Sequence, residues 1–263
     1  MSSILQTVIR ASLLAGNEIM NIYLNGDFDI DFKSDESPLT KADTRSHEII
    51  VGHLKNTNIP ILSEEGKNIP FEERRDLHRL WIVDPLDGTK EFIKRNGEFT
   101  VNIALVENQI PIMGAIYAPA LGTLYYADKG KAYRMEDVTI ENYSKKLKSA
   151  ERLPLQKLSH QKSKYTIVAS KSHLSTETET YIRSLEEKYG EVITISKGSS
   201  LKFCLVAEGT ANEYPRFAPT MEWDTAAGQA ICTSAGYDVI DLNTKKTMLY
   251  NRQNLLNSWF LVK

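Results

Sequence analysis

The segment Leu80-Trp-Ile-Val-Asp84-Pro-Leu-Asp87-Gly-Thr89 contains the pattern on which the fold depends. A run typical of a buried strand ends in two aspartates, and a short helical stretch is predicted to follow at residues 90–94. The end of a strand is where a sheet presents side chains to a crevice, so Asp84 and Asp87 are candidate functional residues. Asp-x-x-Asp-Gly is also ordinary turn chemistry, and this motif alone leaves that alternative open.

Two other segments place carboxylates in comparable positions. The strand-like run at residues 59–62 leads into Ser63-Glu64-Glu65-Gly66, and Trp223-Asp224-Thr225-Ala226-Ala227 places Asp224 at the predicted start of a helix. An N-cap is the purely structural alternative for Asp224. If these segments converge, repulsion between the carboxylates would raise their pKa values unless hard cations neutralise them.

The donor atoms of such a cluster indicate its chemistry. Oxygen ligands without Cys or His favour magnesium, and two cations roughly 3.5–4 Å apart can stabilise both reacting oxygens when a phosphate ester is hydrolysed. The backbone N–H groups of Gly88 and Thr89 would add an anion site. Signatures of dinucleotide binding, nucleoside triphosphate binding, zinc proteolysis and serine hydrolysis are absent, and the five histidines are scattered. We therefore expect a magnesium-dependent phosphatase acting on a small, anionic phosphomonoester.

The remaining sequence predicts an α/β fold with two subdomains. Helices are expected at residues 4–23, 44–54, 175–188, 201–208 and 224–234. Strands are expected at residues 27–33, 59–62, 80–83, 165–169, 192–196, 213–217 and 259–262, and residues 99–106, 110–117 and 123–127 are expected to form an antiparallel sheet. The polar, lysine-rich residues 135–164 predict a connection between subdomains 1–150 and 151–263.

Composition excludes several other classes of protein. The 263 residues are 41% apolar, and 32 basic against 34 acidic side chains give a net charge of −2, so no basic field is present to bind a nucleic-acid polymer. Cys204 and Cys232 lack a Cys-x-x-Cys spacing and suit a reducing compartment. No signal peptide or membrane span is predicted. We expect a cytoplasmic protein, and leave open peripheral membrane association and whether it is a monomer or a homodimer.

The motifs resemble those of the inositol monophosphatase superfamily, whose signatures are Asp-Pro-Ile/Leu-Asp-Gly-Thr and Trp-Asp-x-Ala-Ala. The match includes Ser37-Pro38-Leu39-Thr40-Lys41-Ala42-Asp43 and Leu62-Ser63-Glu64-Glu65-Gly66, in the expected order over most of the chain. The resemblance implies a layered α/β/α/β/α sandwich of the inositol monophosphatase and fructose-1,6-bisphosphatase type.

Within the superfamily, Asp87-Gly-Thr-Lys-Glu-Phe-Ile93 and Asn96-Gly-Glu-Phe-Thr-Val-Asn-Ile-Ala104 resemble the CysQ-type 3'(2'),5'-bisphosphate nucleotidases. This resemblance implies hydrolysis of 3'-phosphoadenosine 5'-phosphate to AMP and phosphate, a place in sulfur metabolism, two or three Mg²⁺ ions and inhibition by Li⁺. A phosphatase of inositol or sugar monophosphates and a non-catalytic binding protein with the same fold are the alternatives. The intact acidic motifs argue against the second of these.

The resemblance also implies roles for individual residues. Glu64, Asp84 and the carbonyl of Leu86 would bind one magnesium ion, and Asp84, Asp87 and Asp224 a second, with Asp84 bridging the two. Thr89, held by Asp43, would orient or deprotonate the attacking water beside Glu64, because a threonine hydroxyl is a poor base alone. The implied substrate-binding residues are Leu86, Asp87, Gly88, Thr89, His173, Ser199, Lys202, Arg216 and Asp224. For His173, Ser199, Lys202 and Arg216, a helix cap or solvated charge is the alternative.

Overall fold

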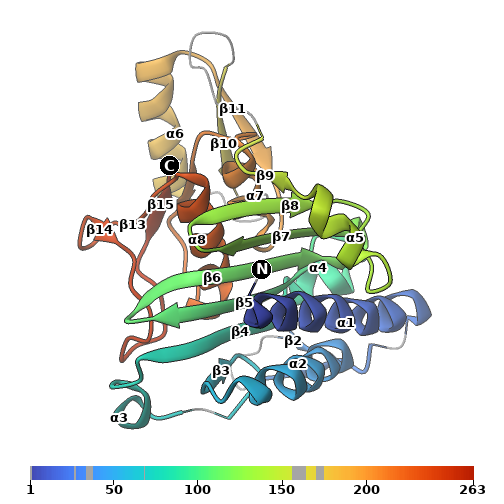
Figure 1. The fold of residues 1–263 in the computed structure, drawn as a ribbon. Coiled ribbons are helices and arrows are strands. Elements are labelled where there is room, and N and C mark those ends of the chain that lie inside the picture. The colour runs from blue at the N-terminus through green and yellow to red at the C-terminus, as the bar shows by residue number, and fades with distance from the viewer. Residues whose placement is uncertain (1, 27, 34–37, 68, 156–163, 170–174) are drawn as a thin grey trace.

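A seven-stranded sheet forms the centre of the molecule (Figure 1). The computed structural model describes residues 2–26, 28–33, 38–67, 69–155, 164–169 and 175–263. Neighbouring strands of the central sheet follow one another along the chain, and only the first pair is parallel. The strands are β3 (Ile61–Ser63), β4 (Arg79–Asp87), β5 (Thr100–Glu107), β6 (Ile110–Ala118), β7 (Thr123–Asp128), β8 (Lys131–Met135) and β9 (Glu151–Arg152).

Helices cover both faces of this sheet. Helices α1 (Ser3–Asn25) and α2 (Lys41–Leu54) pack against each other on one face (Figure 1). Helix α8 (Glu222–Ala235) crosses the other face, and α7 (Leu201–Glu208) lies beside it. Beyond α7 and α8 lie a four-stranded sheet and a parallel pair, and α6 (Thr176–Tyr189) packs on the parallel pair. Their strands are β12 (Tyr214–Arg216), β15 (Phe260–Val262), β13 (Val239–Asp241) and β14 (Lys246–Thr247), then β10 (Tyr165–Ala169) and β11 (Val192–Ser196). The predicted layered α/β/α/β/α architecture is confirmed.

The residues of β4 show why this strand lies between two helical layers. Leu80 and Ile82 belong to the core beneath α7 and α8, whereas Trp81 and Val83 belong to the core beneath α1 and α2. A strand buried on both faces reads as a continuous apolar run, because its side chains alternate between two cores. Asp84 continues the alternation on the α8 side, so the first aspartate of the motif is directed toward the layer that carries Asp224.

Several predicted elements have different ends in the structure. Helix α2 begins at Lys41, not at residue 44, because the Asp43 carboxylate accepts hydrogen bonds from the N–H and hydroxyl groups of Thr40. The strand predicted at residues 27–33 is limited to β1 (Asp31–Phe32), which pairs with β2 (Pro38–Leu39). The shorter helices are α3 (Phe71–Arg74), α4 (Thr89–Ile93) and α5 (Tyr143–Lys146).

Residues 135–164, predicted to be a connection between subdomains, also contain regular secondary structure. They contain α5 and, after it, strand β9, which pairs with β8 and so extends the central sheet. Residues 156–163 lie outside the described part of the chain. The division into subdomains at residue 150 stays a prediction. Among the described residues, no helix combines the length and apolar character required to span a membrane.

Direct contact between backbones fixes α8 on the central sheet. A Cβ atom at Gly114 of β6 would lie 2.7 Å from the carbonyl oxygen of Ala227 and 3.1 Å from its Cα atom. Neither atom is the end of a flexible side chain, so a larger residue at this position would have to displace the helix. The position of α8, and with it that of Asp224, therefore depends on the absence of a side chain at Gly114.

We predict that Gly114→Ala lowers the free energy of unfolding by about 1–3 kcal/mol, the usual cost of overfilling a packed interior. Denaturant titration measures this change. The control is Gly52→Ala in α2, where a Cβ atom would meet no atom within 4 Å. Alanine should stabilise that helix by about 0.5–1 kcal/mol. Equal stability of Gly114→Ala and the parent would show that α8 moves away from β6 at no cost.

Candidate active site

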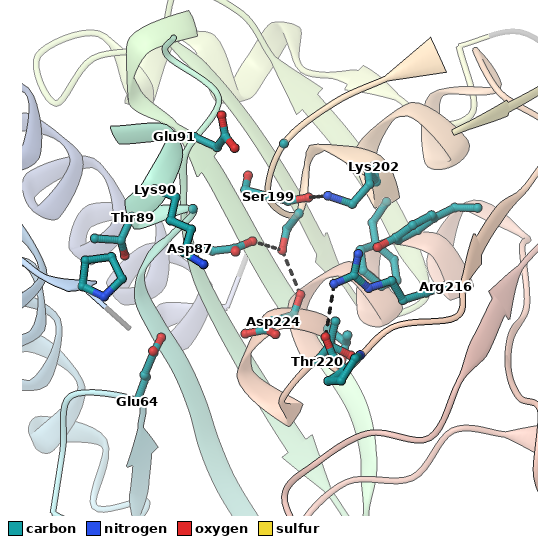
Figure 2. Close-up of a pocket in the computed structure, with 18 of the residues that line it drawn as sticks. Glu64, Asp87, Thr89, Lys90, Glu91, Ser199, Lys202, Arg216, Thr220 and Asp224 are labelled. Carbon is teal, nitrogen blue, oxygen red and sulfur yellow. Dashed lines mark hydrogen bonds between the residues drawn. The ribbon is translucent and has the colours of Figure 1, made fainter. Parts of the chain in front are cut away.

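A pocket of about 490 Å³ opens where β4 ends, beside the first turns of α4, α7 and α8 (Figure 2). It collects residues from both halves of the chain. Those predicted from the sequence that line it are Glu64, Asp87, Gly88, Thr89, Ser199, Lys202, Arg216 and Asp224. The pocket is also lined by residues that sequence reasoning did not select, including Lys90, Glu91, Lys94, Tyr214 and Thr220.

Three of the predicted carboxylates converge at the base of this region. Asp84, Asp87 and Asp224 each offer an oxygen, and these atoms all lie within 4.8 Å of one another. Burial and the neighbouring carboxylates raise the pKa of Asp84 well above its usual range, and burial and Asp87 raise the pKa of Asp224 to about 8. The donor set contains oxygen alone and concentrates negative charge, so it fits a hard divalent cation such as Mg²⁺.

Local hydrogen bonds hold this triad in place. The pairing of β4 with β5 is interrupted between Asp84 and Asp87, and within that irregularity Asp84 Oδ1 accepts from the N–H of Leu86 at 3.0 Å. The buried Ser46 hydroxyl donates to the carbonyl of Pro85 at 2.7 Å. These contacts fix a turn that presents both aspartates on one side.

The structure corrects the predicted helix position of Asp224. Helix α8 begins two residues earlier, at Glu222, so Asp224 is not the N-cap. It lies within the first turn, and its Oδ2 atom accepts from the N–H of Met221 at 2.8 Å. The carboxylate thus satisfies a free N–H at the helix start while it takes part in the triad.

Glu64 lies apart from the triad, on the other side of the pocket (Figure 2). Its Oε1 atom is 2.7 Å from the Lys33 ammonium, which also contacts Glu65 at 2.5 Å. Burial raises the pKa of Glu64 despite the favourable charge of Lys33. The magnesium site predicted from Glu64, Asp84 and the carbonyl of Leu86 stays a prediction, and Lys33 is a contact of Glu64 that the sequence did not reveal.

The predicted Thr89–Asp43 pair is present. The Thr89 hydroxyl lies 3.1 Å from Asp43 Oδ1, and 3.3 Å from the carbonyl of Leu86. The second oxygen of Asp43 accepts both hydrogen bonds from Thr40, at 2.8 and 2.6 Å. Burial raises the pKa of Asp43 to about 6, although the Thr40 bonds act in the opposite direction. Thr40 thereby fixes the carboxylate so that Oδ1 faces Thr89.

Glycine is required at position 88 for two reasons. Its φ angle of 92° lies in the left-handed region, and a Cβ atom would approach the carbonyl of Glu98 to 3.1 Å and Cβ of Ser199 to 3.2 Å. Gly88 therefore allows the end of β4 to lie close to the loop before α7. Phosphate binding by the N–H groups of Gly88 and Thr89 stays a prediction.

Two basic residues, Lys202 and Arg216, line the pocket, and their hydrogen bonds differ. Lys202 donates to the carbonyls of Ser199 at 2.6 Å and Lys197 at 3.3 Å, and burial lowers its pKa to about 8. Arg216 donates from Nη2 to the carbonyl of Pro219, whereas its buried Nε atom has no hydrogen-bond partner among the described residues. Because Arg216 lines the pocket, its guanidinium contributes positive charge to the pocket wall. His173 lies outside the described residues.

The amino-acid sequence of this chain is similar to those of known proteins. The model of the inositol monophosphatase family matches residues 1–261. The chain belongs to the inositol monophosphatase family. It is 45% identical to the 3'(2'),5'-bisphosphate nucleotidase CysQ of Salmonella typhimurium and 43% identical to that of Escherichia coli K12, each over 98% of both chains.

Solved structures of family members have the same fold. A crystal structure of CysQ from Bacteroides thetaiotaomicron is 51% identical and superposes with a TM-score of 0.85, covering 98% of this chain and 96% of that one. The SuhB protein of Bartonella henselae, at 23% identity, has a TM-score of 0.74 over 99% of this chain and 93% of its own, which shows likeness of fold alone. The layered fold is thus shared with a protein of low sequence identity.

We predict that Asp84→Asn stabilises the metal-free protein and removes its response to magnesium. In excess EDTA the variant should unfold at higher temperature, because the amide is neutral at every pH, whereas the buried Asp84 carboxyl must either take up a proton or repel its neighbours, and the amide oxygen can still accept the Leu86 N–H. The gain should be of the order of 1 kcal/mol, since one unit of pKa shift corresponds to about 1.4 kcal/mol. With MgCl2 added, the Tm of the parent should rise and that of the variant should stay nearly constant.

A comparison of the two proteins at two pH values serves as the control for this experiment. Asp224 has a folded-state pKa of about 8 against 3.8 for an ordinary aspartate, so stability from its protonated form is complete below 3.8 and is lost as the pH rises through about 8. The advantage of Asp84→Asn in EDTA should therefore be larger at pH 8 than at pH 6. A variant that gains as much Tm from magnesium as the parent would contradict the metal site.

Proposed function

We propose that the protein is a magnesium-dependent 3'(2'),5'-bisphosphate nucleotidase that hydrolyses 3'-phosphoadenosine 5'-phosphate to AMP and phosphate. The observation that carries the proposal is the triad of Asp84, Asp87 and Asp224 beside a pocket that is also lined by the basic side chains of Lys202 and Arg216. Relatives named CysQ, identical at 43–51% of positions, support the choice of substrate. We also infer inhibition by Li⁺ and a cytoplasmic location.

The acidic residues would provide the metal-binding half of the site. Asp84, Asp87 and Asp224 would hold magnesium, with Glu64 and the carbonyl of Leu86 as further ligands once Glu64 leaves Lys33. Bound magnesium supplies a water of lowered pKa and neutralises charge that develops on the phosphate oxygens. With cations bound, Asp84 and Asp224 would lose their protons, because the positive charge offsets the burial and the repulsion that otherwise raise their pKa values.

Thr89 and Asp43 would control the proton of the attacking water. The Thr89 hydroxyl donates its proton to Asp43 Oδ1 at 3.1 Å, and this bond leaves the lone pairs of the hydroxyl oxygen facing away from Asp43 and able to accept a hydrogen bond from water. Thr40 keeps the carboxylate in this orientation through its two hydrogen bonds. We therefore infer that Thr89 orients the attacking water and assists its proton transfer, and that it does not bind the metal.

The nucleotide would lie against the C-terminal side of the pocket. Arg216 lines the pocket, and the guanidinium group of arginine forms specific, charge-assisted hydrogen bonds with phosphate. Lys202 has a different contribution, since its ammonium already binds the carbonyls of Ser199 and Lys197. We infer that Arg216 reads the 5'-phosphate and that Lys202 supports the Ser199 loop while adding positive charge.

Removal of the Thr89 hydroxyl tests the proton-transfer role. We predict that Thr89→Ala lowers turnover by roughly 10²-fold with little change in the Michaelis constant, the effect expected when proton-transfer assistance is lost. Thr89→Ser, which retains the hydroxyl, should recover part of the rate. A change confined to the Michaelis constant would make Thr89 a binding group instead.

The substrate class is tested by comparing 3'-phosphoadenosine 5'-phosphate with 3'-AMP, which lacks the 5'-phosphate. We predict that Arg216→Ala lowers kcat/KM for the bisphosphate by about one to two decades more than for 3'-AMP, because a lost charge-assisted hydrogen bond costs about 1.5–3 kcal/mol. Lys202→Ala should harm both substrates more evenly, because it also releases the Ser199 loop.

The control for this comparison is Arg183→Ala, which removes an exposed positive charge from α6 and should leave the ratio unchanged. Equal losses on both substrates in Arg216→Ala would show that Arg216 does not bind the 5'-phosphate. A parent enzyme that prefers inositol 1-phosphate would replace the nucleotidase proposal with the alternative function within the same family.

A further inference from the structure

Two buried polar residues interrupt the apolar strand β5 opposite the metal-binding aspartates. In the antiparallel pairing of β4 with β5, Asp84 lies across from Asn102 and Asp87 lies across from Thr100. Thr100 is 0% exposed and Asn102 is 1% exposed. Residues that face each other in this way share one face of the sheet, so both lie against the carboxylate cluster.

A chain of hydrogen bonds joins these residues to Asp87, and the donor and acceptor of each bond can be assigned. The Thr100 hydroxyl donates to Asn102 Oδ1 at 3.0 Å, which leaves the amide Nδ2 of Asn102 to donate to the hydroxyl oxygen of Ser200 at 2.9 Å. Since Ser200 Oγ accepts this bond, its own proton is directed to the remaining neighbours. These are Asp87 Oδ2 at 2.7 Å and the carbonyl of Asp224 at 2.8 Å (Figure 2).

Ser200 therefore joins three elements that carry the site. It immediately precedes α7, is 2% exposed, and contacts one ligand residue from β4 and another from α8. A direct contact between Asn102 Nδ2 and Asp87 Oδ2 is longer, at 3.4 Å, so Ser200 is the principal link between Asn102 and the carboxylate. The hydroxyl fixes one oxygen of Asp87 and limits rotation of that carboxylate.

We propose that Ser200 and Asn102 are positioning residues that orient Asp87 toward magnesium and so determine the affinity of the site for the ion. The inference rests on the metal-binding part of the proposed function and is independent of the substrate. Partners that orient a metal ligand commonly change affinity about 10–100-fold when they are removed. Neither residue has to touch the ion or the phosphate for this effect.

Metal binding by the complete protein tests the proposal without substrate. Ser200→Ala should weaken binding of Mn²⁺, which takes the same oxygen ligands, by about 10–100-fold when free Mn²⁺ is followed by electron paramagnetic resonance. In phosphate-release assays it should raise the magnesium concentration for half-maximal rate by a similar factor, with turnover at saturating magnesium within a few-fold of the parent. Ser200→Cys fills the same space with a weak donor and should also lose affinity, even if the alanine variant fails to fold.

Two comparisons separate positioning from a general loss of stability. Ser12→Ala removes another buried hydroxyl, bonded within α1 to the carbonyl of Val8, and should leave Mn²⁺ affinity unchanged. Asn102→Ala combined with Ser200→Ala should lose little more affinity than Ser200→Ala alone, because both act through one hydroxyl.

Unchanged Mn²⁺ affinity in Ser200→Ala, or full additivity of the two losses, would overturn the proposal. Since the Mn²⁺ measurement contains no nucleotide, rejection of the nucleotidase function leaves its result intact. Conversely, a normal preference for 3'-phosphoadenosine 5'-phosphate together with unchanged Mn²⁺ affinity would reject only the positioning role.

Discussion

The mutual repulsion of Asp84, Asp87 and Asp224 is the constraint on which the rest of the structure depends. Burial and, to a smaller extent, the neighbouring carboxylates raise the pKa values of Asp84 and Asp224. The fold opposes the repulsion with rigid supports: an irregular strand end for the first two residues and a helix pressed backbone to backbone on the sheet for the third. A cation then converts the same charges from a destabilising cluster into a binding site.

Local signals predicted strand β4 and the two aspartates at its end, whereas the layered sandwich and the grouping of Asp224 with them were implied by the resemblance to the inositol monophosphatase superfamily. The apolar run of β4 indicates a strand between two cores, and the aspartates follow it directly. Contacts between distant segments leave no such signal. Ser200 lies 113 residues from Asp87 along the chain, and Lys33 lies 31 residues from Glu64. Strands β13 and β14 were also missed, because two or three residues are too short for an alternating pattern to be detected.

Glu64 and the triad differ in their hydrogen-bond partners, because Glu64 forms an ion pair with Lys33. The triad has only polar neutral groups as hydrogen-bond partners, whereas Glu64 is already neutralised by an ammonium group. An ion that uses Glu64 must replace that contact, whereas among the described residues no ammonium or guanidinium group is hydrogen-bonded to the triad carboxylates. We infer that the triad fills first and that Glu64 joins at higher metal concentration.

The place of β15 in the second sheet has a consequence for synthesis on the ribosome. Strands of the central sheet are neighbours in chain order, so that sheet can assemble progressively as the polypeptide emerges. In the second sheet, β15 lies between β12 and β13 although it follows both in the sequence. A nascent chain can therefore form the central sheet early, but the layer that supports α7 and α8 is completed only after residues 260–262 have left the exit tunnel. Vectorial synthesis thus leaves the sheet beside α8, the helix that carries Asp224, incomplete until β15 has emerged.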